Sequence, residues 1–231
     1  GKYITCIIPW LALLLQAQAR QRPHYIFINS ATNRNWSESR PSGFDRTLID
    51  RITGRINAPA NVKLRIGVSY IFGFLQADMD SVEKSRGRFM RLSEQTGVPI
   101  LISLDGVNWL CDRSDLWNWW DPSRTGYDPA NRKNVEWTGW SDSLAVKICW
   151  RNWGSQIRVL PAPNLMSPAV LSAHIAALRR LIPQIVRWYH SLPAGKKSLL
   201  GGVKLGHETS IGVNAYYYKD GNRYLEKMPD D

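Results

Sequence analysis

The chain has 231 residues, of which 44% are hydrophobic and 21% charged, a composition typical of a folded globular protein and not of a disordered or collagen-like one. Its formal net charge of +11 would suit an acidic partner such as nucleic acid. The lysines and arginines, however, are spread singly or in short pairs such as Lys196-Lys197. Since binding along a phosphate backbone needs cations concentrated on one face, we expect no nucleic-acid partner.

The N-terminus has the pattern of a secretory signal peptide. Lys2 is followed by an apolar run over residues 3–15 and then by a small-x-small sequence at residues 17–19, typical of a cleavage site. The run is too short to span a bilayer. We therefore expect residues 1–19 to be removed and residues 20–231 to be secreted or periplasmic, with no membrane attachment. A buried N-terminal strand or helix is the alternative.

Two cysteines, Cys111 and Cys149, would remain after cleavage. An oxidising compartment would permit them to pair, and two free buried thiols are equally compatible with the sequence.

Four short runs rich in apolar residues predict buried parallel strands. They lie at residues 24–29, 62–72, 98–105 and 199–206. Helical spacing of apolar residues predicts three helices between these strands, at residues 44–56, 78–96 and 168–191.

Capping residues indicate where these helices begin and end. The second helix is expected to begin at a cap formed by Asp80 or Ser81 and to end at Gly97. The third is expected to begin with Ser167 as its N-cap and a proline at the first helical position. Pro183 should kink that helix, because proline removes a backbone donor.

A long stretch, residues 106–166, separates the third strand from the third helix and is rich in tryptophan and turn residues. It contains a predicted hairpin in which residues 144–150 pair with residues 156–160. Connections of this length are uncommon in compact domains and are usually functional. We therefore expect a tryptophan-rich insertion after the third strand.

The alternation of strands and helices predicts an α/β fold with a parallel sheet. Four strands fit half of a (β/α)₈ barrel, because a complete one needs roughly 250 residues. We therefore expect residues 20–231 to form the N-terminal half of such a barrel, truncated at the C-terminus. The alternative is a doubly wound open sheet. That fold favours a glycine-rich phosphate turn after the first strand, where residues 29–33 contain no glycine.

In a parallel barrel, side chains at the C-terminal ends of the strands point into the mouth of the active site. The residues at these ends are Asn29, Tyr70, Asp105 and Glu208. Glu208 follows a run that would otherwise be buried, and a carboxylate there is costly unless it is bonded, solvated or used. Burial also raises a carboxyl pKa, which suits a general acid at neutral pH. The alternative is a carboxylate that only caps the following turn.

The segment 206–212, Gly-His-Glu-Thr-Ser-Ile-Gly, resembles the end of the fourth strand in clan A glycoside hydrolases, which are retaining enzymes on this barrel. In that clan the strand ends in a dipeptide whose second residue, a glutamate, is the acid/base. The resemblance implies this role for Glu208. The preceding clan residue is usually an asparagine that bonds the sugar 2-hydroxyl. This chain carries His207 there, for which we expect substrate binding, with a structural rim histidine as the alternative.

Retaining hydrolysis needs a second carboxyl group about 5 to 5.5 Å from the first, acting as nucleophile. In clan A this nucleophile ends the seventh strand, so the resemblance implies that the four strands expected here lack it. Asp105 is instead expected to bond a sugar hydroxyl. Asp-Gly is also common turn chemistry, and a purely structural turn at residues 105–106 is the alternative.

The tryptophans of the long stretch point to a carbohydrate ligand, because the C–H faces of sugar rings stack on indole. We expect half of these rings to pack the stretch itself instead. The expected substrate-binding residues are Asp105, Asn108, Trp109, Trp119, Trp120, His207 and Asn29, with further ring or hydroxyl contacts from Trp117, Trp137, Trp140, Asp115, Asn118 and Asp121.

The sequence therefore predicts a secreted retaining glycoside hydrolase that acts on a polysaccharide or oligosaccharide, with Glu208 as its catalytic acid/base. The alternative is a non-catalytic carbohydrate-binding barrel or scaffold, which would keep the tryptophans and could dispense with Glu208. We expect no cofactor. No metal is expected either, because the chain has neither a Cys-x-x-Cys nor a His-Glu-x-x-His motif.

Overall fold

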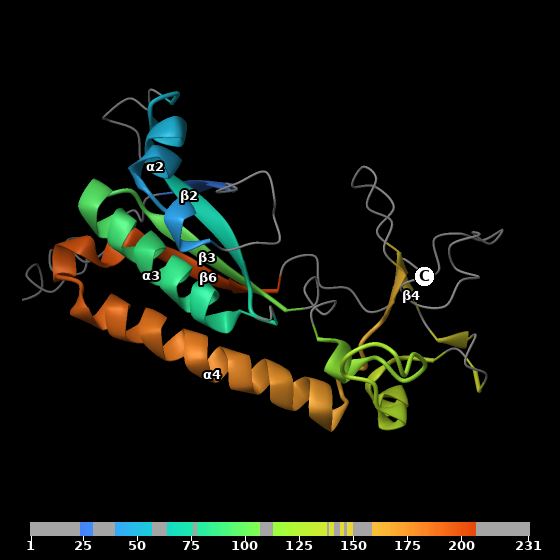
Figure 1. Cartoon of the computed structure of the whole chain (residues 1–231). Coiled ribbons are helices and arrows are strands. Elements are labelled where there is room, and N and C mark those ends of the chain that lie inside the picture. Colours follow the sequence, from blue (N-terminus) through green and yellow to red (C-terminus); the bar gives the residue numbers. More distant parts are fainter. Residues whose placement is uncertain are drawn as a thin grey trace, which may run out of the picture.

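The computed structural model describes residues 24–29, 40–56, 64–75, 78–106, 113–137, 139–140, 144–145, 147–149 and 159–206. In these residues the chain forms a parallel sheet covered by helices, and a tryptophan-rich segment lies beyond one end of the sheet (Figure 1). We call the described residues from 113 to 167 the connecting segment, because they join the third strand of the sheet to the last long helix.

The sheet is all-parallel and has the strand order β1-β2-β3-β6. Its strands are β1 (His24–Asn29), β2 (Leu64–Gly73), β3 (Ile100–Asp105) and β6 (Leu200–Leu205). The predictions of an α/β class and of four parallel strands are confirmed, with each boundary within about two residues of its expected place.

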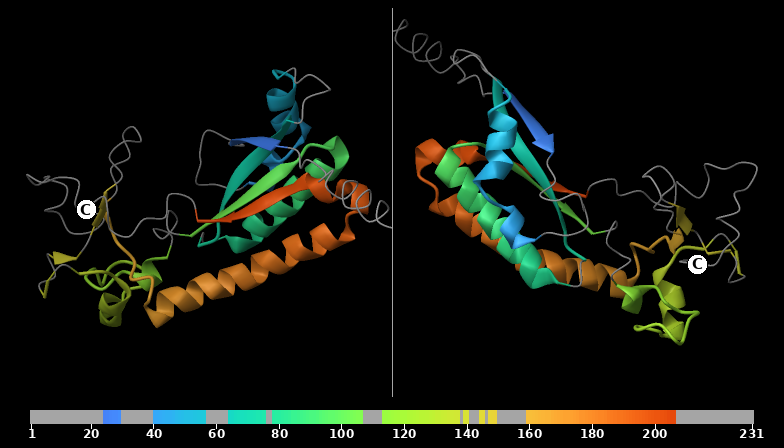
Figure 2. Two further views of the ribbon diagram at one scale, coloured as in Figure 1. Left: turned by 180° about the vertical axis from the view of Figure 1, so that it is seen from behind. Right: turned by 45° about the horizontal axis from the view of Figure 1, so that its top comes forward.

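Three helices lie on one face of this sheet (Figure 2). They are α2 (Arg46–Thr53), α3 (Met79–Thr96) and α4 (Pro168–Ser191), at the three places where the sequence predicts helices. Side chains alternate between the two faces of a strand, so every second residue of β2 and β3 turns toward the helices. These strand residues and the inward helix residues form one buried core, which includes Val68, Tyr70, Phe72, Ile102, Leu104, Leu48, Phe89, Leu181 and Ile185.

Helix α3 begins two or three residues earlier than its expected caps. Asp78 is the N-cap, and its Oδ1 accepts a hydrogen bond of 3.0 Å from the backbone N–H of Ser81. The expected caps, Asp80 and Ser81, lie inside the helix, so that prediction is wrong. The helix ends as predicted at Gly97, whose φ of 72° is the left-handed conformation that glycine adopts most readily.

Polar contacts join helix α4 to helix α3. The Arg180 guanidinium lies 2.6 Å from Asp80 Oδ1 and 2.9 Å from Glu83 Oε1. Near the C-terminal end of α4, Trp188 Nε1 donates a hydrogen bond of 2.6 Å to Glu94 Oε1. The helix continues through Pro183.

The outward side of α4 carries exposed apolar residues beside charged ones such as Arg179 and Arg187. By length and composition, α4 is the one helix among the described residues that could cross a membrane. One side of it packs into the core, and Pro183 interrupts its backbone hydrogen bonds. The outward side carries exposed apolar residues at helical spacing, namely Leu171, Ile175, Ile182 and Val186.

The sheet curls away from its helices. Phe27, in β1, packs over Gly67 in β2, and its ring also occupies the place where a side chain at Gly201 in β6 would lie. Adjacent strands are about 4.8 Å apart, so a flat sheet would separate β1 from β6 by about 14 Å, beyond the reach of a phenylalanine. The Tyr25 hydroxyl likewise bonds the carbonyl oxygen of Ser198, just before β6. The face opposite the helices is therefore concave.

The connecting segment contains short 3-10 helices and a small hairpin. The 3-10 helices that the tryptophans surround are η3 (Ser114–Leu116) and η4 (Pro129–Asn134). The hairpin pairs β4 (Lys147–Cys149) with β5 (Val159–Pro161) in antiparallel register. This agrees with the predicted hairpin, whose turn lies outside the described residues.

Candidate functional site

Two polar side chains meet on the concave face, where the end of β1 lies beside the middle of β2. Asn29 and Ser69 are partners in the strand register, and Ser69 Oγ donates a hydrogen bond of 3.1 Å to Asn29 Oδ1. Ser69 is buried and Asn29 is exposed. Asn29 is thus accessible to a ligand at the C-terminal end of β1. Sequence reasoning chose Tyr70 in this strand instead, and that prediction is wrong: β2 continues to Gly73, and Tyr70 is buried in the core on the helix side. Ser69 was missed because only the strand register places it beside Asn29.

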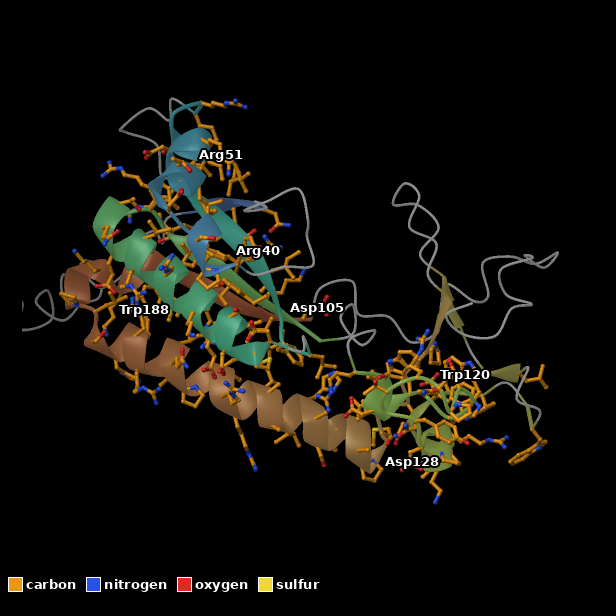
Figure 3. The ribbon with its side chains drawn as sticks, viewed as in Figure 1. Arg40, Arg51, Asp105, Trp120, Asp128 and Trp188 are labelled. Carbon is orange, nitrogen blue, oxygen red and sulfur yellow. The ribbon has the colours of Figure 1, made fainter. Side chains whose placement is uncertain are left out.

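Asp105 ends β3 on the same face as Asn29. Its backbone oxygen accepts a hydrogen bond of 2.8 Å from the N–H of Phe74, and its side chain is 0% exposed. Figure 3 shows Asp105 at the end of the sheet nearest to the connecting segment. Because it is fully buried, Asp105 can meet a sugar hydroxyl only if the chain around it moves.

The glycine after Asp105 lies close to two aromatic side chains. A Cβ at Gly106 would lie 2.5 Å from the Phe74 ring and 3.0 Å from His174 Nε2. The rings of Phe74 and His174 themselves meet edge to face, with centroids 5.3 Å apart. The Asp-Gly dipeptide therefore marks a close approach between the sheet and the first turns of α4.

His174 is a further candidate that sequence reasoning missed. Its Nδ1 lies 2.9 Å from the carbonyl oxygen of Val170, and this bond requires Nδ1 to carry the proton. In the neutral ring Nε2 is then an acceptor, and it lies beside Gly106 at the edge of the sheet. A single histidine at a helical position belongs to no motif, so nothing in the sequence singled it out.

Several expected site residues lie outside the described residues. These are Asn108, Trp109, His207 and Glu208, and the expected signal peptide and Cys111 lie outside them as well. The last described residue before His207 is Gly206, whose N–H donates a hydrogen bond of 2.7 Å to the carbonyl oxygen of Leu104. The sheet is thus described up to the edge that precedes Glu208 in the sequence.

Tryptophans form the core of the connecting segment. Trp117 and Trp119 are 1% and 5% exposed. The half-buried Trp120 stacks on Trp117 with a centroid distance of 5.4 Å and meets Trp119 edge to face at 4.8 Å. Trp119 Nε1 is buried without a hydrogen-bond partner among the described residues. This arrangement favours packing roles for Trp117 and Trp119, the alternative that the sequence left open, and leaves part of Trp120 accessible.

A buried chain of hydrogen bonds ties this core to helix α4. The side chain of Asn118 is fully buried and bonds the backbone at Asp121, so it is not presented to a ligand. Asn134 Nδ2 donates to Asn131 Oδ1 at 3.0 Å, and Ser167 Oγ donates to Asn134 Oδ1 at 2.5 Å. Ser167 occupies the N-cap position of α4 as predicted, but its hydroxyl makes no capping bond.

Two acids of the connecting segment are engaged in local bonds. Arg113 donates two hydrogen bonds of 2.8 Å to the carboxylate of Asp115, which lower the pKa of Asp115. The pKa of Asp121 is also lowered, chiefly by the hydroxyl of Ser123, 2.6 Å from its Oδ1. Both acids are therefore held as carboxylates, able to accept but not donate hydrogen bonds at neutral pH.

A hollow of about 440 Å³ opens on the connecting segment. Arg132, Lys133, Trp137, Gly139 and Trp140 line it. The Arg132 guanidinium lies over the Trp137 ring, 5.0 Å from its centroid, and Trp137 Nε1 donates a hydrogen bond of 2.9 Å to the backbone oxygen of Arg132. These contacts fix one indole and one cation in the wall of the hollow.

The hollow and the edge of the sheet are separate surfaces. Figure 3 shows Trp120 and Asp128 in the connecting segment, standing apart from Asp105 at the end of the sheet. The structure thus places Asn29 and Ser69 side by side, puts Asp105 on the same face but four residues farther along in the strand register, and does not bring Trp120 to them.

Within the described part of the chain, no three His, Cys, Asp or Glu side chains gather as a metal site would require. No family model matches this chain, and searches of curated proteins and of solved structures found no match either.

Proposed function

We propose that this chain belongs to a secreted (β/α)-barrel glycoside hydrolase that acts on a glycan at the C-terminal edge of the sheet. The observation that carries the proposal is the concave face of the sheet, on which three adjacent strands place polar side chains: Asn29 beside Ser69, and Asp105 at the end of β3. A concave surface with a few convergent polar groups is the usual form of a small-molecule site.

The barrel architecture is supported by strand order and curvature. Parallel strands in sequential order, with α2, α3 and α4 on one face, are what a (β/α)₈ barrel requires. A doubly wound sheet would carry helices on both faces. Val203 and Leu205 of β6 turn toward the helix side and are exposed, which fits a fold in which a further strand and helix pack against this edge.

Glu208 is the proposed general acid/base. It lies two residues after Gly206 in the sequence, a separation that the covalent chain limits to about 7.6 Å between Cα atoms. In retaining hydrolysis, such a glutamate donates its proton to the glycosidic oxygen as the bond to the sugar breaks. A second carboxylate attacks the anomeric carbon, and the glutamate then takes a proton from the water that releases the sugar.

A non-catalytic carbohydrate-binding protein is the second candidate. Trp140 favours it, because this indole is 100% exposed in the wall of the hollow on the connecting segment. Such a protein would bind glycans without cleaving them.

The variant Glu208→Gln in the full-length secreted protein tests the catalytic proposal. Hydrolysis of an unactivated glycan should fall by about 10² to 10⁴-fold, because glutamine cannot transfer the proton. An aryl glycoside with a good leaving group should lose less in its first step. Glu136→Gln, which changes the charge equally in the connecting segment, should retain activity.

Three outcomes separate the candidates. Full activity of Glu208→Gln on the unactivated glycan would exclude Glu208 as the acid. Glycan binding by the wild-type protein without any hydrolysis would favour the binding protein. Secreted material that still carries residues 1–19 on N-terminal sequencing would contradict the proposed cleavage of a signal peptide.

A further inference from the structure

The hydrogen bond between Ser69 and Asn29 joins a buried side chain to an exposed one. The two residues are partners in the register of β1 and β2, on the concave face of the sheet. Ser69 is 5% exposed, whereas Asn29 is exposed. Ser69 Oγ donates the hydrogen bond of 3.1 Å to Asn29 Oδ1. The serine thus holds the asparagine from beneath the surface that a ligand would meet.

The direction of this bond decides which atom of the Asn29 amide is offered to a ligand. A primary amide carries an acceptor oxygen and a donor nitrogen on opposite sides of its terminal carbon. Because Oδ1 faces the Ser69 hydroxyl, Nδ2 and its N–H donors point the other way. The pair therefore presents hydrogen-bond donors, which match the hydroxyl and ring oxygens of a sugar.

Ser69 is the one polar side chain on the concave face of β2 within residues 67–73. The other positions on that face of the strand are two glycines and one isoleucine. On its other side Ser69 is paired with Leu101 of β3, whose side chain has no hydrogen-bonding group. A buried hydroxyl costs free energy unless it is bonded, and Asn29 provides the bond.

An apolar floor lies beside the pair. Phe27 is two residues before Asn29 on the same face, and its half-buried ring covers Gly67 of β2 and Gly201 of β6. Tyr25 stacks on this ring, with centroids 5.5 Å apart. Donor groups beside an aromatic floor suit a sugar, whose C–H face packs on the floor while its oxygens accept hydrogen bonds.

We propose that Ser69 is a positioning residue of the glycan site, which holds the Asn29 amide so that Nδ2 donates to an oxygen of the sugar. The inference rests on the proposed function, because it names how that site recognises its glycan. Loss of the Ser69 hydroxyl should therefore weaken glycan binding only through Asn29.

A matched pair of variants tests the role of the hydroxyl. Ser69→Thr and Ser69→Val have side chains of the same shape, and only threonine keeps the donor. The full chain is titrated by calorimetry with cellohexaose, xylohexaose, mannohexaose and chitohexaose. Ser69→Val should weaken binding of the hexasaccharide that the wild-type chain binds by about three- to tenfold, the factor for one hydrogen bond. Ser69→Thr should retain the affinity, and urea unfolding of both variants measures any strain from the added methyl group.

A double-mutant cycle separates positioning from a structural role. Asn29→Ala should weaken binding by about tenfold, because the donors are lost. In the wild-type background Ser69→Ala should weaken binding as Ser69→Val does. In the Asn29→Ala background it should have no further effect on affinity, since there is no amide to hold. Asn29→Asp keeps the acceptor without the donors and should bind no more tightly than Asn29→Ala.

The possible results differ for the two proposals. Equal affinity of Ser69→Thr and Ser69→Val would overturn the positioning role and leave the carbohydrate function standing. A loss of affinity on Ser69→Ala that persists without the Asn29 side chain would do the same. A wild-type chain that binds none of the hexasaccharides would count against both proposals.

Discussion

The hydroxyl of Tyr25, in the first strand, lies 3.4 Å from the carbonyl oxygen of Ser198, which is separated from it by 173 residues and precedes the last strand of the sheet. Arg65, in β2, also reaches Ser198, with its Nη1 3.2 Å from Ser198 Oγ. Side chains of the first two strands thus converge on the segment that leads into β6. This convergence requires the sheet to be curled, and the first prediction tests it.

Gly67→Ala should destabilise the fold by about 1 to 3 kcal/mol, the usual cost of overpacking. A Cβ at this position would overlap the Phe27 ring and lie 2.7 Å from the backbone oxygen of Pro99, which cannot easily move. Urea unfolding measures the change in free energy. Gly195→Ala is the control, because a Cβ there meets nothing within 4 Å. Equal stability of the two variants would contradict the packing of Phe27 over β2.

Arg86 and Gln184 provide a second prediction. Arg86 is fully buried between helices, and its Nη2 donates a hydrogen bond of 2.6 Å to Gln184 Oε1. Its Nε and Nη1 have no partner among the described residues, and burial lowers the pKa of Arg86 to about 10, opposed by the charge of Glu83. Gln184→Leu alone should cost about 1 to 3 kcal/mol, since it leaves a further buried donor unpaired.

The double variant Arg86→Met with Gln184→Leu should be as stable as the wild-type chain or more stable, by up to about 4 kcal/mol. It removes the buried charge together with its partner. A double-mutant cycle, with each free energy of unfolding measured in urea, gives the interaction energy between Arg86 and Gln184. A double variant less stable than Gln184→Leu would show that the arginine is fully compensated in the folded state.

The connecting segment gives a third prediction. Trp119→Ala should destabilise this segment by about 3 to 5 kcal/mol, because Trp119 fills its core. Trp119→Phe should cost less, since it also removes an indole N–H that has no partner among the described residues. Thermal unfolding followed by tryptophan fluorescence measures both, with Trp140→Ala as the exposed control. A stability loss in Trp140→Ala as large as that in Trp119→Ala would contradict this division of roles.

Helix α3 supports a prediction on pH. The hydroxyl and backbone N–H of Ser81 lower the pKa of Asp78 below its ordinary value of 3.8. A carboxyl group whose pKa is lower in the folded state stabilises the fold above its unfolded-state pKa, and this contribution is lost as the pH falls through the folded-state pKa. Asp78→Asn keeps a capping acceptor and does not titrate. Its melting temperature should therefore fall less than that of the wild-type chain below pH 3.8, and parallel curves would refute the capping role.

The strands and helices were predictable because their apolar residues are local and periodic. The run at residues 24–29 matches β1 fully, and Gly97 ends α3 where a left-handed residue was needed. The cap of α3 was placed too late because Asp78, Asp80 and Ser81 all suit the position, and only the geometry selects Asp78. Composition alone cannot separate such neighbours.

The candidate site was less predictable, because burial depends on contacts distant in the sequence. Trp119 and Trp140 both lie in the tryptophan-rich stretch of the sequence. Trp119 nevertheless lies in the core of the connecting segment, whereas Trp140 is fully exposed. Ser69 meets Asn29 through strand register and His174 lies beside Gly106 through helix packing, and no local pattern encodes either contact.

The bond from Ser167 to Asn134 has a consequence for how the chain unfolds. Ser167 immediately precedes Pro168, the first residue of α4, and its hydroxyl ends the buried chain of hydrogen bonds that runs through the connecting segment. Melting of that segment would expose this chain to water and free the first turn of α4, which also packs against Phe74 through His174. Heat should therefore melt the two regions in one cooperative transition, and a scanning calorimeter should record a single endotherm where two independent units would give two.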